Sequence, residues 1–375
     1  MKCFSVLSFF FFSTLLLGQS DSVQQLELLF VGDIMQHKPQ IKAAQKGPNK
    51  YDFKSPFEYV QPLIQKADLA IGNLELTLPG NPPYQGYPQF RSPDQLASDL
   101  RSVGFDLLFT ANNHSNDAGG DGVVNTIETL KSNGLYQTGT FKNKIERDLF
   151  YPLIIHKKGF KLGFLNYTYD TNGLKTQVPT YVNYIDKQEI AQDLEMLHVL
   201  RPDFIIVMMH WGKEYQLYEN KKQRQLAQWL LDNGVDIIVG AHPHVVQPIK
   251  EYRLSESEKP ITTASNADIP TRLVAYSLGN FISNQTKPYT DGGIMLSIKL
   301  EKRLKTKRTY LLSHDYIPVW RYVQRYADGK RRYFVLPVSA SNKYKGLQLT
   351  IKDMNAMNDF VKHTRTRLNK ERHTR

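Results

Sequence analysis

The sequence predicts an α/β fold, because short apolar runs alternate with amphipathic helical patterns from about residue 26 to 285. Polar residues that can bind a metal or transfer a proton follow each of five runs that are typical of buried strands. These runs are LELLFV (26–31), ADLAIG (67–72), FDLLFTA (105–111), PDFIIVMM (202–209) and VDIIVGA (235–241). Ligands of open α/β sheets bind beyond the carboxyl ends of the strands, so we expect these polar residues to converge on one edge of one sheet.

Helices are predicted between these strands, and an aspartate precedes several of the strands. The helical patterns span 93–104, 121–134, 187–200 and 221–234, with Gly104 and Gly234 as C′ caps. The recurring aspartates are Asp68, Asp106, Asp203 and Asp236. Residues 154–169 predict a hairpin that turns at 157–159.

The last hundred residues and one long loop do not show the alternation of strands and helices. Alternating patterns predict strands at 275–282, 292–301, 307–323 and 331–338, and we expect them to form a second sheet packed against the first. The loop at 79–93 is rich in Pro, Gly and Tyr and is long enough to be functional. A lid or substrate rim and an inert surface loop are equal alternatives for it.

The first twenty residues predict an exported protein. Met1-Lys2 precedes an apolar stretch with the length of a signal-peptide core, and Gly18-Gln19-Ser20 offers a cleavage site before Asp21. An uncleaved N-terminal anchor is the alternative; both place the body in the periplasm, the cell envelope or outside the cell. Cys3 is the only cysteine, so a metal site in the mature chain must use histidine, amide and carboxylate ligands.

The net charge of +12 favours anionic partners such as polyanionic polymers, phosphates or lipid headgroups. Part of this charge lies in the tail at 361–375. A nucleic-acid partner is not expected for an exported protein. We interpret the tail as a solvated C-terminal helix, with a dedicated binding arm as the alternative.

His242-Pro243-His244 is the sharpest metal-binding signal. Two histidines separated by one residue on an extended backbone point to the same side, and the proline stiffens the segment. His210 ends another apolar strand, and neutral imidazoles suit one shared ion or two adjacent ions. A buried structural histidine is the alternative for each one alone, but their combined pattern disfavours it.

Asn112-Asn113-His114 adds an amide ligand and an acid/base group at a third strand end. The amide can ligate a metal, and His114 can protonate a leaving group or stabilise a transition state. An Asx-turn is the alternative for this segment. Asp33 and Glu75 are weak signals when each is taken alone, because turn and capping roles explain most such residues.

Together these segments predict a metal site with one or two ions. The candidate ligands are Asp33, Asn73 or Glu75, Asn113, His210, His242 and His244. Two adjacent ions can activate water against phosphate or amide esters, with His114 and Glu75 as candidate catalytic groups. Lys213 and Glu214 are candidates to hold a substrate anion or tune a ligand, with a surface ion pair as the alternative.

Six ordered segments carry a family resemblance. They are Gly32-Asp33-Ile34-Met35, Gly72-Asn73-Leu74-Glu75, Ala111-Asn112-Asn113-His114, His210-Trp211-Gly212-Lys213-Glu214-Tyr215, Gly240-Ala241-His242-Pro243-His244-Val245 with Gln247-Pro248, and Ser277-Leu278-Gly279-Asn280-Phe281. Over residues 26–285 the sequence resembles the CapA/PgsA-like poly-γ-glutamate capsule synthesis proteins, which are similar to calcineurin-like metallophosphoesterases. The resemblance implies a four-layer α/β/β/α metallophosphoesterase-like sandwich with a mostly β C-terminal part.

The resemblance assigns roles to individual residues. Asp33 matches the first metal-binding Asp, Asn113-His114 match the Asn-His pair, His210 matches the single His, and His242 with His244 match the paired His. Asn280, in the last segment, is a candidate substrate contact. The implied cofactor is one or two divalent ions, such as Mn, Zn or Fe.

Two positions depart from the phosphoesterase pattern. Met35 stands where the first-motif His is expected, and Asn73 stands where the metal-bridging Asp is expected, which leaves Glu75 as the only nearby carboxylate. A neutral amide binds a dication more weakly than a carboxylate does. One of the two metal sites is therefore expected to be weak or absent.

The predicted organisation is a signal peptide at 1–20, a CapA-like domain at 26–285, a C-terminal β part of the same sandwich at 286–350 and a basic helix or tail at 351–375. The first functional hypothesis is a metal-dependent hydrolase or transferase that acts on an anionic cell-surface polymer, such as poly-γ-glutamate. The second is a non-catalytic partner that binds or guides poly-γ-glutamate beside membrane-bound synthase partners. A third, a plain metallophosphoesterase, requires Glu75 to replace the missing carboxylate.

Overall fold

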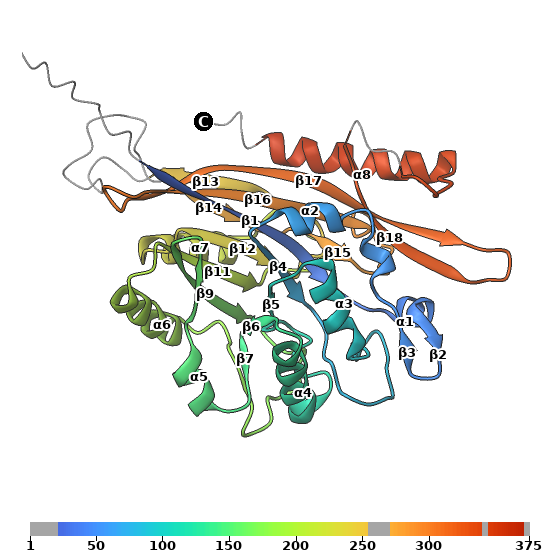
Figure 1. Cartoon of the computed structure of the whole chain (residues 1–375), viewed down its shortest axis with the longest axis horizontal. Coiled ribbons are helices and arrows are strands. Elements are labelled where there is room, and N and C mark those ends of the chain that lie inside the picture. The colour runs from blue at the N-terminus through green and yellow to red at the C-terminus, as the bar shows by residue number, and fades with distance from the viewer. Residues whose placement is uncertain (1–21, 254–270, 340–343, 371–375) are drawn as a thin grey trace, which may run out of the picture.

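The computed structural model describes residues 22–253, 271–339 and 344–370, which contain two large β-sheets (Figure 1). The predicted signal peptide and residues 371–375 of the predicted tail lie outside the described residues. The first sheet has the order β18-β17-β16-β1-β4-β5-β6, and β15 also pairs with β1. Its strands are β1 Val23–Ile34, β4 Leu69–Leu74, β5 Leu107–Phe109, β6 Tyr136–Thr138, β15 Asn280–Ile282, β16 Gly292–Arg303, β17 Thr309–Arg325 and β18 Arg331–Pro337.

The second sheet has the order β13-β14-β12-β11-β9-β8. Its strands are β8 Leu153–Lys157, β9 Phe160–Thr168, β11 Phe204–His210, β12 Ile237–Ala241, β13 Ile249–Arg253 and β14 Thr271–Ala275. Two short ribbons pair β2 with β3 and β7 with β10. Their strands are β2 Gln45–Gly47, β3 Lys50–Tyr51, β7 Thr140–Phe141 and β10 Tyr181–Val182.

Helices pack against both large sheets. The helices are α1 Lys38–Ala44, η1 Ser55–Phe57, α2 Gln61–Lys66, α3 Gln95–Val103, α4 Gly119–Ser132, α5 Lys144–Phe150, α6 Lys187–Leu200, α7 Lys221–Asp232 and α8 Ile351–Lys370. The four predicted helices appear as α3, α4, α6 and α7. The predicted hairpin is confirmed as β8–β9, and positive φ at Lys158 and Gly159 suits its two-residue turn.

Three apolar clusters establish the layer order. Between the sheets, Phe30 and Ile71 of the first pack with Phe164, Ile206 and Val239 of the second. On the outer face of the first sheet, a second cluster includes buried side chains of α2, α3 and α4. A third cluster joins α6 and α7 to the outer face of the second sheet. The fold is therefore the four-layer α/β/β/α sandwich that the resemblance implies.

Three expectations about the strands and sheets are wrong. The five apolar runs divide between two sheets, with β1, β4 and β5 in the first and β11 and β12 in the second. The C-terminal strands β16–β18 do not build a second sheet, because β16 pairs antiparallel with β1 and extends the first. The pattern at 275–282 is also not one strand, since β14 and β15 belong to different sheets. An apolar run indicates burial on both faces but does not specify the neighbouring strand.

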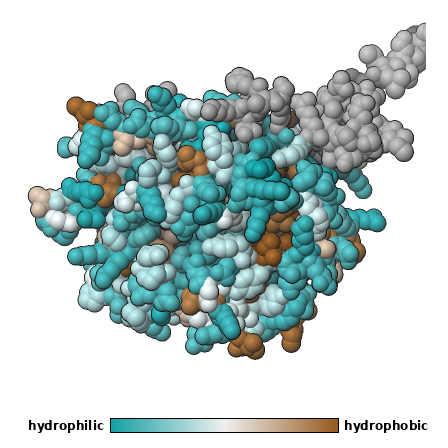
Figure 2. Space-filling view, turned by 180° about the vertical axis from the view of Figure 1, so that it is seen from behind, coloured by the Kyte–Doolittle hydropathy of each residue, from teal (hydrophilic) through white to brown (hydrophobic). Residues whose placement is uncertain are grey.

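The C-terminal helix α8 is packed rather than solvated all round, which corrects the expectation for the tail. Phe360 and Val361 pack against Trp320 and Phe334 of the first sheet, and Figure 1 shows α8 lying along this sheet. Arg367 donates a hydrogen bond to the carbonyl of Val246. None of the helices in the described residues is long and apolar enough to cross a membrane. Figure 2 shows a mostly hydrophilic face with scattered apolar residues.

The recurring aspartates hold neighbouring parallel strands in register. The Oδ2 atom of each accepts a backbone N–H from the adjacent strand: Asp68 from Glu27 at 2.9 Å, Asp106 from Ala70 at 3.0 Å, Asp203 from Lys161 at 2.8 Å and Asp236 from Ile205 at 2.8 Å. The backbone N–H of each Asp donates in return to the carbonyl of the same residue. Each pair of bonds fixes where the strand after the aspartate starts relative to its neighbour.

We predict that Asp236→Ala lowers the free energy of unfolding by about 1–3 kcal/mol, because the N–H of Ile205 loses its acceptor. Burial raises the pKa of Asp236 to about 6, above its ordinary value of 3.8. The protonated carboxyl therefore stabilises the fold at low pH, and this contribution is lost as the pH rises through the folded pKa, by up to about 1.4 kcal/mol per unit. Asp236→Asn keeps an acceptor and cannot titrate.

The measurement is urea unfolding of the wild type and both variants from about pH 4 to pH 7. The stability of Asp236→Asn relative to the wild type should increase with pH over this range. Parallel pH profiles for these two proteins would contradict the assignment.

Candidate metal centre

All seven predicted ligands are buried at the carboxyl-end edges of the two sheets. Five of them lie at or just after the ends of β1, β5, β11 and β12, and the other two lie in and just after β4. They are Asp33, Asn73, Glu75, Asn113, His210, His242 and His244. The structure therefore brings together residues that are up to 211 positions apart, as in the contact of Asp33 with His244.

Five of the seven predicted ligands form two overlapping groups. Glu75, His210 and His242 form the first, and Asp33, Glu75 and His244 form the second; within each group the ligand atoms lie within 4.8 Å of one another. Glu75 belongs to both groups. Its Oε1 atom lies 3.8 Å from Nε2 of His210 and 3.8 Å from Nε2 of His244. Glu75 is thus placed to bridge two adjacent ions.

Within the described part of the chain, three buried atoms in this cluster lack a hydrogen-bond partner: Oε1 of Glu75, Nδ1 of His242 and Oδ1 of Asn73. Buried polar atoms are nearly always hydrogen-bonded, so an unsatisfied carboxylate oxygen and imidazole nitrogen require an explanation. Both are ligand atoms for divalent transition metals. The residues therefore fit one or two such ions.

Asn73 makes a different contact from the one expected of a bridging ligand. Its Nδ2 atom donates to Oδ1 of Asp33 at 2.8 Å and lies 3.4 Å from Oε2 of Glu75. In this arrangement Asn73 orients the two carboxylates. Met35, at the place of the first-motif His, is buried in the apolar cluster on the outer face of the first sheet.

Burial sets the protonation of the cluster. Burial, and then the neighbouring Asp33, raise the pKa of Glu75 well above its usual range. Burial, and then the neighbouring histidines, lower the pKa of His210, and burial lowers the pKa of His242 to about 3. His210 and His242 are therefore neutral, which is the form that binds metals.

His114 forms a dyad with Asp117, a residue that sequence reasoning missed. Nδ1 of His114 lies 2.6 Å from Oδ2 of Asp117, and both side chains are buried. A proton on Nδ1 would be held by this carboxylate, which leaves Nε2 to exchange a proton with a substrate. The signal was present as an acidic residue three positions after His114 in the same turn.

The loop at 79–93 covers this dyad. Phe90 is buried between His37 and His114, with ring centroids 4.8 and 4.6 Å away. The backbone N–H of Phe90 donates to Asp117, whereas Tyr87 is 79% exposed. This packing supports the interpretation of the loop as a substrate rim.

The three predicted substrate residues differ in their burial and in their contacts with the ligand His244. Asn280 is buried, and its Oδ1 lies 3.1 Å from Nδ1 of His244, so it orients that ligand. Glu214 is 42% exposed at its side chain, and its Oε1 lies 3.9 Å from Nε2 of His244. Lys213 is exposed, and among the described residues it forms no ion pair with Glu214.

Tyr169 and His37 were also missed by sequence reasoning. The ring of Tyr169 lies 4.5 Å from that of His242 and 6.3 Å from that of His210. Nδ1 of His37 accepts from the backbone N–H of Asn284. Neither belongs to a recognisable motif, and only the fold brings them to the cluster.

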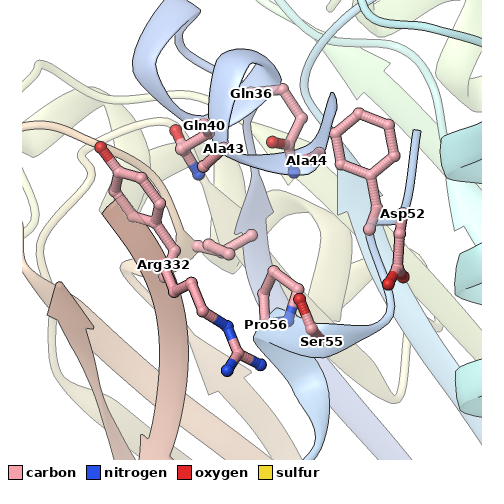
Figure 3. A pocket seen from close by; sticks show the side chains of 11 residues that line it. Gln36, Gln40, Ala43, Ala44, Asp52, Ser55, Pro56 and Arg332 are labelled. Atoms are coloured by element: carbon pink, nitrogen blue, oxygen red, sulfur yellow. The ribbon is translucent and has the colours of Figure 1, made fainter. Parts of the chain in front are cut away.

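A small cavity near α1 is distinct from the ligand cluster (Figure 3). It measures about 10 Å³, which is room for about one water molecule, and none of the predicted ligands lines it. Gln36, whose Nε2 is buried without a partner, lines it together with Gln40 and Arg332. The cavity is too small to be the substrate site.

The layered fold and the His, Asp and Glu donor set define a metallophosphoesterase-like protein. Residues 27–285 match the family described as bacterial capsule synthesis protein PGA_cap. The chain is 31% identical over 294 residues to the PGA biosynthesis protein CapA of Bacillus subtilis, covering 76% of this chain and 69% of the relative. It belongs to this capsule synthesis family.

Other similar proteins include the capsule biosynthesis protein CapA of Bacillus anthracis, 28% identical over 273 residues, with 70% of this chain and 61% of the relative covered. Among solved structures, the calcineurin-like phosphoesterase YfkN of Bacillus subtilis has a TM-score of 0.47 at 14% identity, covering 92% of this chain and 98% of that one. The NAD nucleotidase of Haemophilus influenzae has a TM-score of 0.48 at 12% identity, covering 91% and 63%.

We predict opposite effects for two substitutions at neighbouring positions of the cluster. Asn73→Asp adds a third carboxylate beside Asp33 and Glu75 and removes the donated hydrogen bond, so the metal-free protein should lose on the order of 2 kcal/mol of stability. The added charge should strengthen metal binding. Glu75→Gln should instead abolish binding at both ligand groups, because they share this carboxylate.

Thermal unfolding with and without added Mn²⁺ or Zn²⁺ measures both effects. The metal-induced rise in melting temperature should be larger than wild type for Asn73→Asp and absent for Glu75→Gln. A metal-induced rise in melting temperature in Glu75→Gln as large as that of the wild type would exclude Glu75 as the bridging ligand.

Proposed function

We propose that the chain is an exported metal-dependent hydrolase or transferase that acts on an anionic cell-surface polymer. Poly-γ-glutamate and phosphate-bearing envelope polymers are the candidate substrates. Membership of the capsule synthesis family supports a polymer substrate. The single observation that carries the metal dependence is the unsatisfied Oε1 of buried Glu75, which lies between His210 and His244.

In this proposal, some residues of the cluster are metal ligands and another transfers a proton. Glu75, His210 and His242 would hold one ion, and Asp33, Glu75 and His244 a second. When bound, such ions act as Lewis acids toward the reacting group and increase the acidity of water. The histidine and carboxylate donors suit Mn, Zn or Fe.

The chain's own residues supply orientation and a proton. Asp117 fixes the ring of His114, so that Nε2 of this histidine would deliver a proton to the leaving group. Phe90 packs against the same ring and shields it from solvent. The net charge of +12 would attract a polyanionic substrate.

Export and assembly are part of the proposal. The apolar stretch in residues 1–20 supports export to the periplasm, envelope or exterior, with or without an anchor. Membrane-bound synthase partners are proposed because polymer synthesis and transfer would occur together at the membrane. No nucleic-acid partner is proposed.

A non-catalytic polymer-binding role is the second candidate. It is favoured by Asn73, which donates to Asp33 where a phosphoesterase has a bridging carboxylate, and by Met35, which is buried in the apolar core. In this role the cluster would bind the polymer without turnover. The two candidates differ in whether the protein retains metal and turns over substrate.

We predict that the purified protein contains about one or two equivalents of Mn, Zn or Fe. His210→Ala and His242→Ala should each lower the metal content sharply while the fold is retained, because each removes a ligand of the first group. His156→Ala, an exposed histidine on β8, is the matched control. Elemental analysis measures all four proteins. Unchanged metal in both ligand variants would refute the site, and a folded wild type that cannot be loaded favours the binding role.

We also predict that His114→Ala lowers kcat by roughly 10²–10⁴ without lowering metal content, since it removes the proton donor. Asp117→Asn should show a smaller loss, because only the orientation of the ring is disturbed. Asp121→Asn, an exposed residue of α4, is the control. Turnover would be assayed on γ-glutamyl and phosphoester substrates. Full activity in His114→Ala would remove this histidine from the mechanism.

A further inference from the structure

Arg321 is an enclosed cation without an ion-pair partner among the described residues. Its Nη2 donates to the carbonyl of Gln285 at 3.0 Å, and its Nε is buried with no hydrogen-bond partner. Asp291, the carboxylate that interacts with it electrostatically, accepts a hydrogen bond from Nε1 of Trp320 at 2.7 Å. A buried guanidinium donor that is left unsatisfied is costly, so Arg321 is suited to receive an anion.

A short chain of side chains connects Arg321 to the metal centre. Oε1 of Gln285 accepts from Nδ2 of Asn280 at 2.8 Å, and Oδ1 of Asn280 lies 3.1 Å from Nδ1 of His244. Burial, and then the neighbouring His244 and Arg321, lower the pKa of His37. Arg321 therefore stands beside the metal centre but is not part of it.

Lys287 is a second cation near His244. Its Nζ lies 3.9 Å from the ring centroid of Tyr215, and that ring lies 6.1 Å from the ring of His244. Lys287 is exposed, and it belongs to the same connection between β15 and β16 as Gln285. Glu214, adjacent to Tyr215, is an acidic residue near the same histidine. An enclosed guanidinium and an exposed ammonium group are thus each connected to His244 through neighbouring side chains.

We propose that Arg321 and Lys287 form a subsite for a carboxylate of the substrate that neighbours the group at the metal centre. The guanidinium binds carboxylates through two parallel hydrogen bonds, and the ammonium group acts as a mobile point charge. The subsite selects polymers with repeated carboxylates over isolated phosphoesters. It rests on the proposed polymer substrate, and it lies beyond residues 27–285, the segment matched to the family.

The test measures binding by calorimetry, without turnover, at low and high salt. The ligands are γ-linked hexaglutamate and its α-carboxamide analogue, γ-linked hexa-isoglutamine, which share a backbone but differ in the charge of the α-substituent. Arg321→Gln should weaken hexaglutamate binding by roughly tenfold or more, and Lys287→Gln should weaken it less. Arg331→Gln, which removes an exposed charge from β18, is the control and should bind as the wild type does.

Several results would overturn the subsite. The first is an unchanged affinity for hexaglutamate in Arg321→Gln. The second is an equal loss of affinity for both oligomers in this variant, and the third is no binding of hexaglutamate by the wild type. If Arg321→Gln does not fold, binding by Arg321→Lys and Lys287→Gln tests the subsite instead. Arg321→Lys keeps the charge but loses the planar guanidinium, and Lys287→Gln changes an exposed residue. A protein that binds hexaglutamate through Arg321 but turns nothing over refutes the catalytic proposal and retains the subsite.

Discussion

The paired hydrogen bonds of four aspartates set the register on which the site depends. Asp68 and Asp106 join β1, β4 and β5 in the first sheet, and Asp203 and Asp236 join β9, β11 and β12 in the second. Parallel strands of one sheet end at the same edge, so the polar residues at and after their carboxyl ends meet there, although the β1–β4 register shifts between Phe30 and Asp33. The apolar layer between the sheets then brings the two edges together. Five ligand residues from four strand ends can thereby form two overlapping groups.

Much of this arrangement could be predicted from the sequence. The apolar runs, the helices between them and the strand-end histidines are local patterns, and they appear in the structure at nearly the predicted bounds. Which strands belong to which sheet could not be predicted from local patterns, because Leu26 pairs with Leu300 across most of the chain and no local pattern encodes that partner. Tyr169 and Arg321 were missed for a related reason, since each comes near the metal centre only through tertiary packing. Asp117 differs, because its spacing from His114 was a local signal.

Asn73 stands where a bridging aspartate is expected, and Glu75 supplies a carboxylate in its place. The two side chains alternate with Leu74, so both reach the same cluster, and the longer glutamate extends its Oε1 between His210 and His244. A neutral amide then lies between two buried carboxylates and donates a hydrogen bond to Asp33, which reduces their mutual repulsion. The chain thus keeps one shared carboxylate, displaced by two residues from its expected position.

The most direct test of this account is anomalous X-ray diffraction from crystals of the protein loaded with Mn²⁺ or Zn²⁺. The account predicts two anomalous peaks on either side of Oε1 of Glu75, one beside His210 and His242 and the other beside Asp33 and His244. A single peak bound through Oδ1 of Asn73, or peaks that leave Glu75 without a metal contact, would contradict it.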